Sequence, residues 1–456
     1  MATTITIADS YSPADLSANS SIAFKFALIF VFLRFSYLHE VFRSLTGLNS
    51  YMLYMFGPPP ILAVIFCGGL RRTFREKAPR FWLAFAVWMI LAVPFSAWKG
   101  GSFTEAMSYV RTDFIMLPIM AGLATNWADC KKLIQAIAWA AVFDVAIAYL
   151  LFGTRSDRLR LNWQGSVANS NDFAAHLLLI LPFVLFIVLK PGTRTLVRLF
   201  LTGTIILGIL AILRTASRGA LLAIVVTLVF LLLTGSARQR ITVGVTAIVV
   251  TLVLITLLPA DTWNRLTDFS ESSQNSDISI STDVRRNLLR ESIVLTLENP
   301  LFGVGPFQFI NYGNDAKTGQ TNDYAWRGTH NSYTQISSEC GLPALGFYLA
   351  AIISTFALLA KIRKRTTPGN EISTAAYCIT VGSLAYCTAA FFLNFGYSFE
   401  FLAISGLTTA IGCVVREHSA TLAPQVASNR TWERNRPLQS TRPTSLEVSN
   451  IADRSS

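Results

Sequence analysis

Long apolar runs dominate this chain, and they constrain its fold more than any other feature of the sequence. A helix needs about 20 mostly apolar residues to cross the hydrocarbon core of a membrane, and we identify twelve runs that approach this length. The 456 residues are 52% hydrophobic and only 14% charged, which leaves too little polar surface for a soluble enzyme or a disordered chain. The sequence therefore predicts an all-α polytopic membrane protein with about 12 transmembrane helices.

Two of the twelve runs are irregular. The second contains Pro58, Pro59 and Pro60, so it is expected to kink or to start late. The fourth contains Arg111 and Asp113, and we expect Asp113 to form an intramembrane ion pair rather than a catalytic dyad. The runs are 22–38, 52–70, 81–98, 106–125, 133–152, 173–189, 196–213, 218–234, 241–258, 341–360, 374–394 and 397–415.

The net charge of +12 would suggest nucleic-acid binding in a soluble protein. Here the aromatic residues lie inside the apolar runs and no basic stripe is present, so no nucleic-acid partner is expected. With the N-terminus inside, the short cytoplasmic loops hold about twice as many Lys and Arg as the short outer loops. Both termini are therefore expected in the cytoplasm. The polar residues 1–20 lack a basic start, so no cleavable signal peptide is expected.

The polar segments divide the chain into three parts. Residues 1–20 are expected to form a cytoplasmic N-terminal segment, residues 21–415 a transmembrane domain, and residues 416–456 a disordered cytoplasmic tail. Within the domain, residues 259–340 are too long for a simple connector and predict a functional outer, periplasmic loop.

Part of this loop shows helical spacing of apolar positions. Residues 284–298 predict a helix along the membrane surface, with Thr282 or Asp283 as its N-cap and Asn299-Pro300 at its end. No Cys or His spacing typical of a metal site occurs, so no metal or cofactor is expected.

Arginines gather on the outer side, where the positive-inside rule predicts few of them. Arg214 and Arg218 are four residues apart and share a face of a helical turn, and Ser217 is placed to cap the helix that follows. Two guanidinium groups beside a helix N-terminus would make an anion site. The alternative is a tight hairpin whose arginines reach out to lipid phosphates.

A second group comprises Arg285, Arg286 and Arg290 in the expected surface helix. They too can bind an anion, or they can belong to a basic amphipathic helix that touches membrane lipid headgroups. The spacing alone does not say which arginine binds a ligand.

The polar residues near these arginines include His330, just before the tenth run and close to Glu339. A histidine beside an anion site is a candidate general base, because its pKa lies near the working pH. Asn169, Asn171 and Asp172 precede or begin the sixth run and can bind sugar hydroxyls or cap that helix. His176 is expected to be a packed helix residue.

At this point the chain resembles the O-antigen ligase and polysaccharide polymerase superfamily of bacterial inner-membrane proteins. The order, spacing and sidedness of four stretches between about residues 160 and 360 carry the resemblance. They are VANSNDFAAHL at 167–177, SRGA at 217–220, VRRNLLRESIVLTLENPLFGVGPFQF at 284–309 and HNSYTQISSECGLPALGFYL at 330–349.

The resemblance implies the polyprenyl-dependent multi-span glycosyltransferase fold and transfer of a glycan from undecaprenyl pyrophosphate to an acceptor hydroxyl at the periplasmic face. It implies that Arg218 and Arg285, supported by Arg214, bind the pyrophosphate. It further implies that His330 acts on the acceptor by direct displacement with inversion, without a metal. Possible glycan contacts are Asn171, Asn331 and Glu339.

One departure from the family pattern lies in the loop helix. Leu289 stands where the family often has an aromatic residue. Arg285 is chosen over Arg286 from its spacing to the Pro300–Gly303 stretch.

Several functions remain open at the sequence level. A polymerase would join lipid-linked repeats, a ligase would move the chain to lipid A–core, and a protein O-oligosaccharyltransferase would move it to Ser or Thr. A flippase or transporter of lipid-linked saccharide is the alternative from another class, and it would require charges at mid-membrane and internal symmetry.

Overall fold

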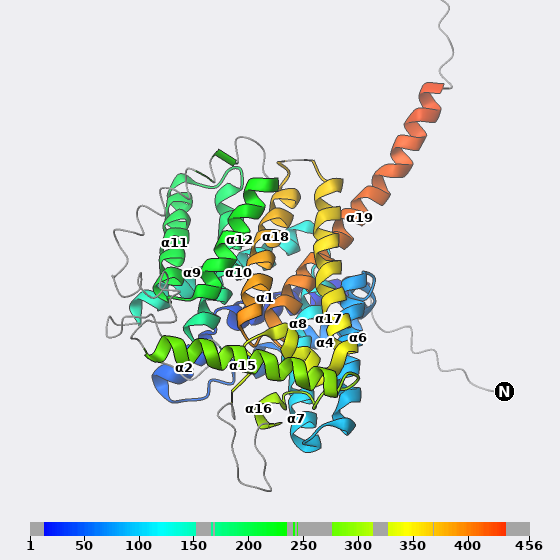
Figure 1. Ribbon diagram of the computed structural model, residues 1–456. Coiled ribbons are helices and arrows are strands. Elements are labelled where there is room, and N and C mark those ends of the chain that lie inside the picture. The colour runs from blue at the N-terminus through cyan, green and yellow to red at the C-terminus, as the bar shows by residue number, and fades with distance from the viewer. Residues whose placement is uncertain are drawn as a thin grey trace, which may run out of the picture. The chain divides into compact units, whose positions relative to one another are not determined.

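The computed structural model describes residues 13–151, 166, 169–234, 240–241, 244, 276–312, 327–367 and 369–434, and no strand occurs among them. The chain forms two units, Met1–Val414 and Val415–Ser456. Apart from residues 241 and 244, the run 241–258 lies outside the described residues, as do residues 259–275 and 313–326 of the loop. Figure 1 shows the helices of the first unit.

The helices follow the apolar runs in order. They are α1 (Pro13–Phe35), α2 (Leu38–Thr46), α3 (Met52–Phe56), α4 (Pro58–Phe66), α5 (Gly69–Thr73), α6 (Lys77–Ala92), η1 (Val93–Phe95), α7 (Lys99–Tyr109), η2 (Val110–Phe114), α8 (Met116–Leu123), α9 (Trp127–Leu150), α10 (Ser170–Leu189), α11 (Thr195–Arg214), α12 (Arg218–Thr234), α15 (Ser276–Glu298), α16 (Phe309–Tyr312), α17 (Ser332–Arg365), α18 (Glu371–Ala389), η3 (Ala390–Phe392) and α19 (Phe399–Arg434).

By length and composition, seven of the described helices can cross a membrane, or eight if the bent pair α1 and α2 forms one span. The protein is therefore an all-α polytopic membrane protein, as predicted. The count of about 12 stays a prediction, because α12 and the segment Met52–Phe66 are apolar but shorter.

Both irregular runs are interrupted, the second at the prolines where a kink or late start was expected. In the second run, α3 ends before Gly57 and α4 begins at Pro58, since proline fits the first turn of a helix and not its interior. In the fourth run, a π-helical turn at Val110–Phe114 separates α7 from α8. That turn contains Asp113, which pairs with Arg34 of α1 at 2.7 Å. The predicted ion pair thus exists, with a partner far away in sequence.

The centre of the bundle is α10, which packs against α9, α11 and α18. Small residues let three helices approach closely at one point: Ala175 of α10, Ala223 of α12 and Ala385 of α18 belong to a single buried cluster. This packing brings the N-terminus of α12 beside η3, where Gly219 lies against the ring of Phe392.

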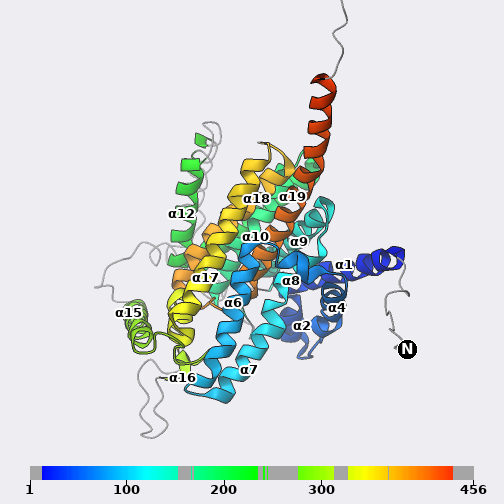
Figure 2. The same cartoon turned by 90° about the vertical axis from the view of Figure 1, so that its right-hand side faces the viewer.

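Helix α15 lies crosswise to the bundle. It runs across the ends of α12, α18 and α17 in Figure 1 and is seen end-on in Figure 2. It ends at Glu298, before Asn299-Pro300, as expected. Its start was predicted wrongly, because the helix begins at Ser276 rather than after Thr282 or Asp283. Thr282 and Asp283 therefore lie inside the helix. A residue type that favours the N-cap position does not prevent a helix from starting earlier in the chain.

The turn after α15 is fastened to the first half of α17. The backbone N–H groups of Val304 and Gly305 donate to the carbonyls of Ser338 and Glu339, at 2.8 and 2.9 Å. Gly303 has φ +64°, and a Cβ there would lie 2.3 Å from the backbone of Glu339. Only glycine allows this close approach, so the GVG sequence fixes how the outer loop meets α17.

Helix α19 continues to Arg434, beyond residue 416, from which a disordered tail was expected. Residues 416–434 contain no glycine and a single proline, so few residues there oppose a helix. Residues 435–456 lie outside the described residues.

Candidate active site

The turn between α11 and α12 presents Arg218 at the start of a helix. Ala216 has φ +51° and reverses the chain, and the Ser217 hydroxyl oxygen accepts a hydrogen bond from the N–H of Ala220 at 3.3 Å. The predicted Ser217 cap is therefore confirmed. Arg218 is the first residue of α12, where the helix dipole and the first N–H groups favour a negatively charged ligand.

The arginines of α15 differ in their surroundings. Arg285 is half-buried, whereas Arg286 is exposed. The helix is held in place by Leu288 and Leu295, which are buried in a cluster with Val304 and Phe309 of the following turn. This anchoring fixes the face that α15 presents to the bundle.

His330 precedes α17 in a conformation that few residues adopt. Its φ is +50°, in the left-handed region. Its backbone N–H donates to Oδ1 of Asn394 at 2.7 Å, and the Thr329 hydroxyl lies 3.0 Å from the same oxygen. Asn331 caps α17 by accepting from the N–H groups of Tyr333 and Thr334. The backbone of His330 is thus held from both sides.

The chain segment that carries Asn394 is itself bound to α17. The Ser332 hydroxyl donates to the carbonyl of Leu393 at 2.7 Å, and the N–H of Phe395 donates back to that hydroxyl oxygen at 2.8 Å. The N–H of Gly396 donates to the side chain of Gln335 at 3.2 Å. A rigid frame therefore sets the position of Asn394, and through it that of His330.

These elements enclose a cavity of about 610 Å³ with a basic side and an apolar side. Arg218, Arg285 and Arg286 line it together with His330 and Asn331. We call this the arginine cavity. Its other lining residues are mostly apolar: Gly219, Leu221, Leu222, Val225, Leu289, Thr329, Phe391 and Phe392.

The charge state of His330 follows from this environment. Burial, and then the positive charges of Arg285 and Arg327, lower the pKa of His330 from its ordinary value to about 4. The expectation of a pKa near the working pH thus does not hold for the free protein. At neutral pH the imidazole is uncharged, so one ring nitrogen has a lone pair that can accept a proton.

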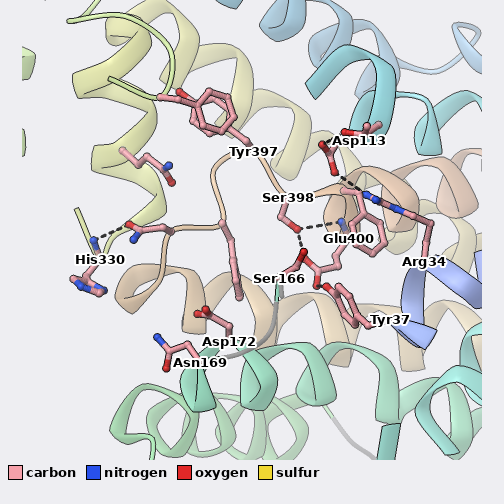
Figure 3. A pocket seen from close by; sticks show the side chains of 16 residues that line it. Arg34, Tyr37, Asp113, Ser166, Asn169, Asp172, His330, Tyr397, Ser398 and Glu400 are labelled. Carbon is pink, nitrogen blue, oxygen red and sulfur yellow. Dashed lines mark hydrogen bonds and ion pairs between the residues drawn. The ribbon is translucent and has the colours of Figure 1, made fainter. Parts of the chain in front are cut away.

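A second cavity, of about 430 Å³, is also lined by His330 and has mostly polar lining residues (Figure 3). We call it the polar cavity. In Figure 3, His330 lies at one side of the cavity, and Arg34 and Asp113 lie at the other. The cavity is lined by Arg34, Tyr37, Thr112, Asp113, Ser166, Asn169, Asp172, Phe307, His330, Gln335, Asn394, Phe395, Tyr397, Ser398, Phe399 and Glu400.

A buried network supports one wall of the polar cavity. Glu400 accepts hydrogen bonds from Tyr37 and Tyr386, both at 2.8 Å, and is also bonded to Ser398. His176 lies 3.0 Å from Glu400 and 3.2 Å from Asp144. His176 is therefore packed inside the bundle, as predicted. Among the described residues, no three Asp, Glu, His or Cys side chains are grouped as metal ligands.

The structure gathers some of the predicted site residues and separates others. Arg218, Arg285, His330 and Asn331 line the arginine cavity. Arg214, Asn171 and Glu339 are not among the residues that line either cavity.

Arg214 ends α11, and its charge acts on Tyr149. Glu339 is buried and accepts hydrogen bonds from the N–H groups of Phe307 and Phe309, at 3.0 and 3.3 Å.

Asn394 and Glu400 were missed by sequence reasoning. Both lie within an apolar run, where a single polar residue carries no spacing signal. The local signal was the FFLNFGYSFE stretch at 391–400, in which Asn, Gly, Ser and Glu interrupt an apolar sequence. Polar residues at membrane depth are costly and often functional, but only the fold shows that these two line one cavity with His330.

Comparison with known families gives one match. Residues 203–349 match the family model described as O-Antigen ligase. The match covers roughly a third of the chain and includes Arg214, Arg218, Arg285 and His330. A search of curated proteins gave no match.

Proposed function

We propose that this chain, which the match over residues 203–349 identifies as a member of the O-antigen ligase and polymerase superfamily, is a membrane glycosyltransferase. It would transfer a glycan from undecaprenyl pyrophosphate to an acceptor hydroxyl at the periplasmic face of the bacterial inner membrane. In this proposal the N- and C-termini lie in the cytoplasm, and the acceptor is a glycan, lipid A–core or a protein.

One observation carries the proposal: His330, Arg218 and Arg285 line a single cavity whose other lining residues are mostly apolar. A polyprenyl pyrophosphate needs both properties, because its phosphates require cations while its chain requires an apolar surface. Leu221, Leu222 and Val225 of α12 extend from Arg218 along the helix and offer that surface. Planar guanidinium groups can bind phosphate oxygens through paired hydrogen bonds.

The chemistry follows from the same arrangement. The acceptor oxygen attacks the anomeric carbon, and the bond from that carbon to the phosphate oxygen breaks with inversion. The proton of the acceptor hydroxyl goes to the uncharged imidazole of His330, and the lipid pyrophosphate leaves with the bonding electrons. Fixed guanidinium groups stabilise the negative charge that grows on the leaving group.

Binding of the pyrophosphate should also change the pKa of His330, the proposed base. Its negative charge offsets the field of Arg285, which is one reason that the pKa of His330 is low. Donor binding is therefore expected to raise the pKa of His330 and make it a better base. This coupling favours proton transfer only when the donor is present.

A flippase or transporter of lipid-linked saccharide remains the second candidate, and one observation favours it. Charged groups lie deep among the helices, as the Arg34–Asp113 pair and the His176–Glu400 contact show. These groups bind one another, however, and the match over residues 203–349 is to a ligase family. We therefore prefer the transferase.

Glycan analysis of a deletion strain tests the proposal. The strain is complemented with wild type, His330→Ala or Arg290→Ala, where Arg290 is an exposed arginine of α15 outside the arginine cavity. Wild type and Arg290→Ala should restore transfer, and His330→Ala should not. Single repeats on lipid in the deletion would indicate a polymerase, and full-length chains stranded on undecaprenyl pyrophosphate would indicate a ligase for lipid or protein.

Two results would count against the transferase. Unchanged glycans in the deletion strain would contradict it, as would full transfer by His330→Ala. Lipid-linked repeats confined to the cytoplasmic face would support the flippase instead.

A further inference from the structure

The polar cavity shares His330 with the arginine cavity, and Arg218, Arg285 and Arg286 are not among its described lining residues. In an inverting displacement, the attacking oxygen and the leaving phosphate lie on opposite sides of the anomeric carbon. If the phosphates lie at Arg218 and Arg285, the acceptor hydroxyl must approach His330 from the opposite side. Resting on the proposed function, we propose that the polar cavity binds the acceptor sugar, and that it selects a neutral or amino sugar over a uronic acid.

The size and polarity of the cavity fit a saccharide. Its volume of about 430 Å³ lies within the range of about 300–1,000 Å³ for pockets that take small organic ligands. The polar side chains Asn169, Asp172 and Asn394 all line it. Carboxylates and amides are well suited to sugar hydroxyls, since a carboxylate accepts and an amide both donates and accepts.

An aromatic wall supplies the second element of sugar recognition. The rings of Phe307 and Tyr397 stack with their centroids 4.0 Å apart, and both residues line the cavity. The C–H face of a pyranose ring packs favourably on an aromatic surface of this kind. A phosphate or a lipid chain would not use both the aromatic wall and the carboxylates.

The charges in the cavity disfavour an acidic sugar. Among its described lining residues, Arg34 alone carries a fixed positive charge, and Asp113 neutralises it at 2.7 Å. The guanidinium of Arg34 also lies 4.0 Å from the ring centroid of Phe399, which limits its movement. A uronic acid would therefore bring a carboxylate toward Asp172 and Glu400, and among the described lining residues only the paired Arg34 carries a fixed positive charge that could offset it, although the charge of Arg285 acts on Asp172 from outside the cavity.

Asp172 is the residue best placed to set this selectivity. It lies in the first turn of α10, whose cap residue is Asn169, and Figure 3 shows both side chains at the same wall of the cavity. No hydrogen bond or ion pair holds its carboxylate within the described part of the chain. The carboxylate is thus available to a ligand, and its replacement by the isosteric amide should leave the fold intact.

The experiment measures sugar binding separately from transfer. Full-length protein in nanodiscs is applied to an array of short oligosaccharides that contain neutral, N-acetylated, amino or uronic acid units. Wild type should bind neutral or amino oligosaccharides more tightly than uronic ones. Asp172→Asn should weaken that binding about tenfold, as expected for the loss of one charge-assisted hydrogen bond. It should also narrow the preference for neutral or amino oligosaccharides over uronic ones. Glu105→Gln, the same change at an exposed position outside both cavities, should behave as wild type.

The outcomes separate this inference from the proposed function. Arg218→Ala should lose transfer but keep the array binding. Absence of binding across the array, a preference for uronic acids, or an unchanged profile in Asp172→Asn would each overturn the inference, whether or not transfer occurs. Selective sugar binding by a protein whose arginine and His330 variants still transfer would overturn the proposed function and leave the inference standing.

Discussion

The backbone N–H of His330 donates a hydrogen bond to Oδ1 of Asn394 at 2.7 Å, although 64 residues separate them. This bond holds His330 in a left-handed conformation with φ +50°. A non-glycine residue in that region costs of order 1–3 kcal/mol unless the surrounding structure fixes it. Asn394 is therefore a positioning residue for the candidate base.

Replacing Asn394 with Ala should lower the kcat of transfer about tenfold or more, with little change in the KM for the donor. The physical reason is that a base displaced by about 1 Å loses much of its effect. Asn394→Asp retains an acceptor oxygen and should recover much of the activity. Steady-state kinetics in nanodiscs check the prediction, and equal losses in the Ala and Asp variants would argue against positioning through this oxygen.

The pH dependence of kcat/KM should reveal the low pKa of His330. Burial and the charges of Arg285 and Arg327 lower that pKa from 6.5 to about 4. Because a base acts in its unprotonated form, kcat/KM should hold as pH falls through 6.5 and decline only near pH 4. Arg327→Gln removes one positive neighbour, so it should move the acidic limb toward higher pH.

Thermal melting of the same proteins over the same pH range separates a loss of stability from a loss of catalysis. An unfolded histidine binds its proton near pH 6.5, so the contribution of His330 to stability is present above that pH and declines as pH falls toward about 4. Arg290→Gln should leave the activity profile unchanged. An acidic limb at 6.5 in wild type would contradict the environment described for His330.

The arginines of α15 should not be equivalent. Arg285 is half-buried and Arg286 is exposed, although both line the arginine cavity. Arg285→Ala should therefore reduce donor kcat/KM more than Arg286→Ala, and Arg290→Ala should have no effect. A guanidinium binds phosphate oxygens in pairs and an ammonium does not, so Arg218→Lys should restore little. A larger loss in Arg286→Ala would assign the donor contact to that residue.

A variant of Glu339 tests whether this residue stabilises the fold or contacts a glycan. Its carboxylate accepts from the N–H groups of Phe307 and Phe309 and fastens the GVGPFQF turn to α17. Glu339→Ala should lower the free energy of unfolding by about 1–3 kcal/mol, because it leaves buried N–H groups without acceptors. Thermal melting measures this loss. If Tm is unchanged while glycan transfer falls, the predicted glycan contact of Glu339 is favoured instead.

The positions of the membrane helices could largely be read from the sequence, since apolar length alone decides whether a helix can cross the hydrocarbon core. The breaks at Pro58 and at Asn299-Pro300 were also readable, because proline removes an N–H donor and restricts its neighbours. The start of α15 at Ser276 could not be read from the sequence, because the first turns of this helix lack a hydrophobic pattern.

The sequence by itself determined that this chain is a helical membrane protein, since hydropathy is a local property, and it singled out Arg218, Arg285 and His330 as candidate site residues. It did not determine that Arg218, Arg285 and His330 share one cavity. Nor did it reveal Asn394 behind His330 or the polar cavity that joins Asp113, Asp172 and Glu400. These relationships join residues far apart in the chain, and only the packing of α10, α12, α17 and α18 decides which of them meet.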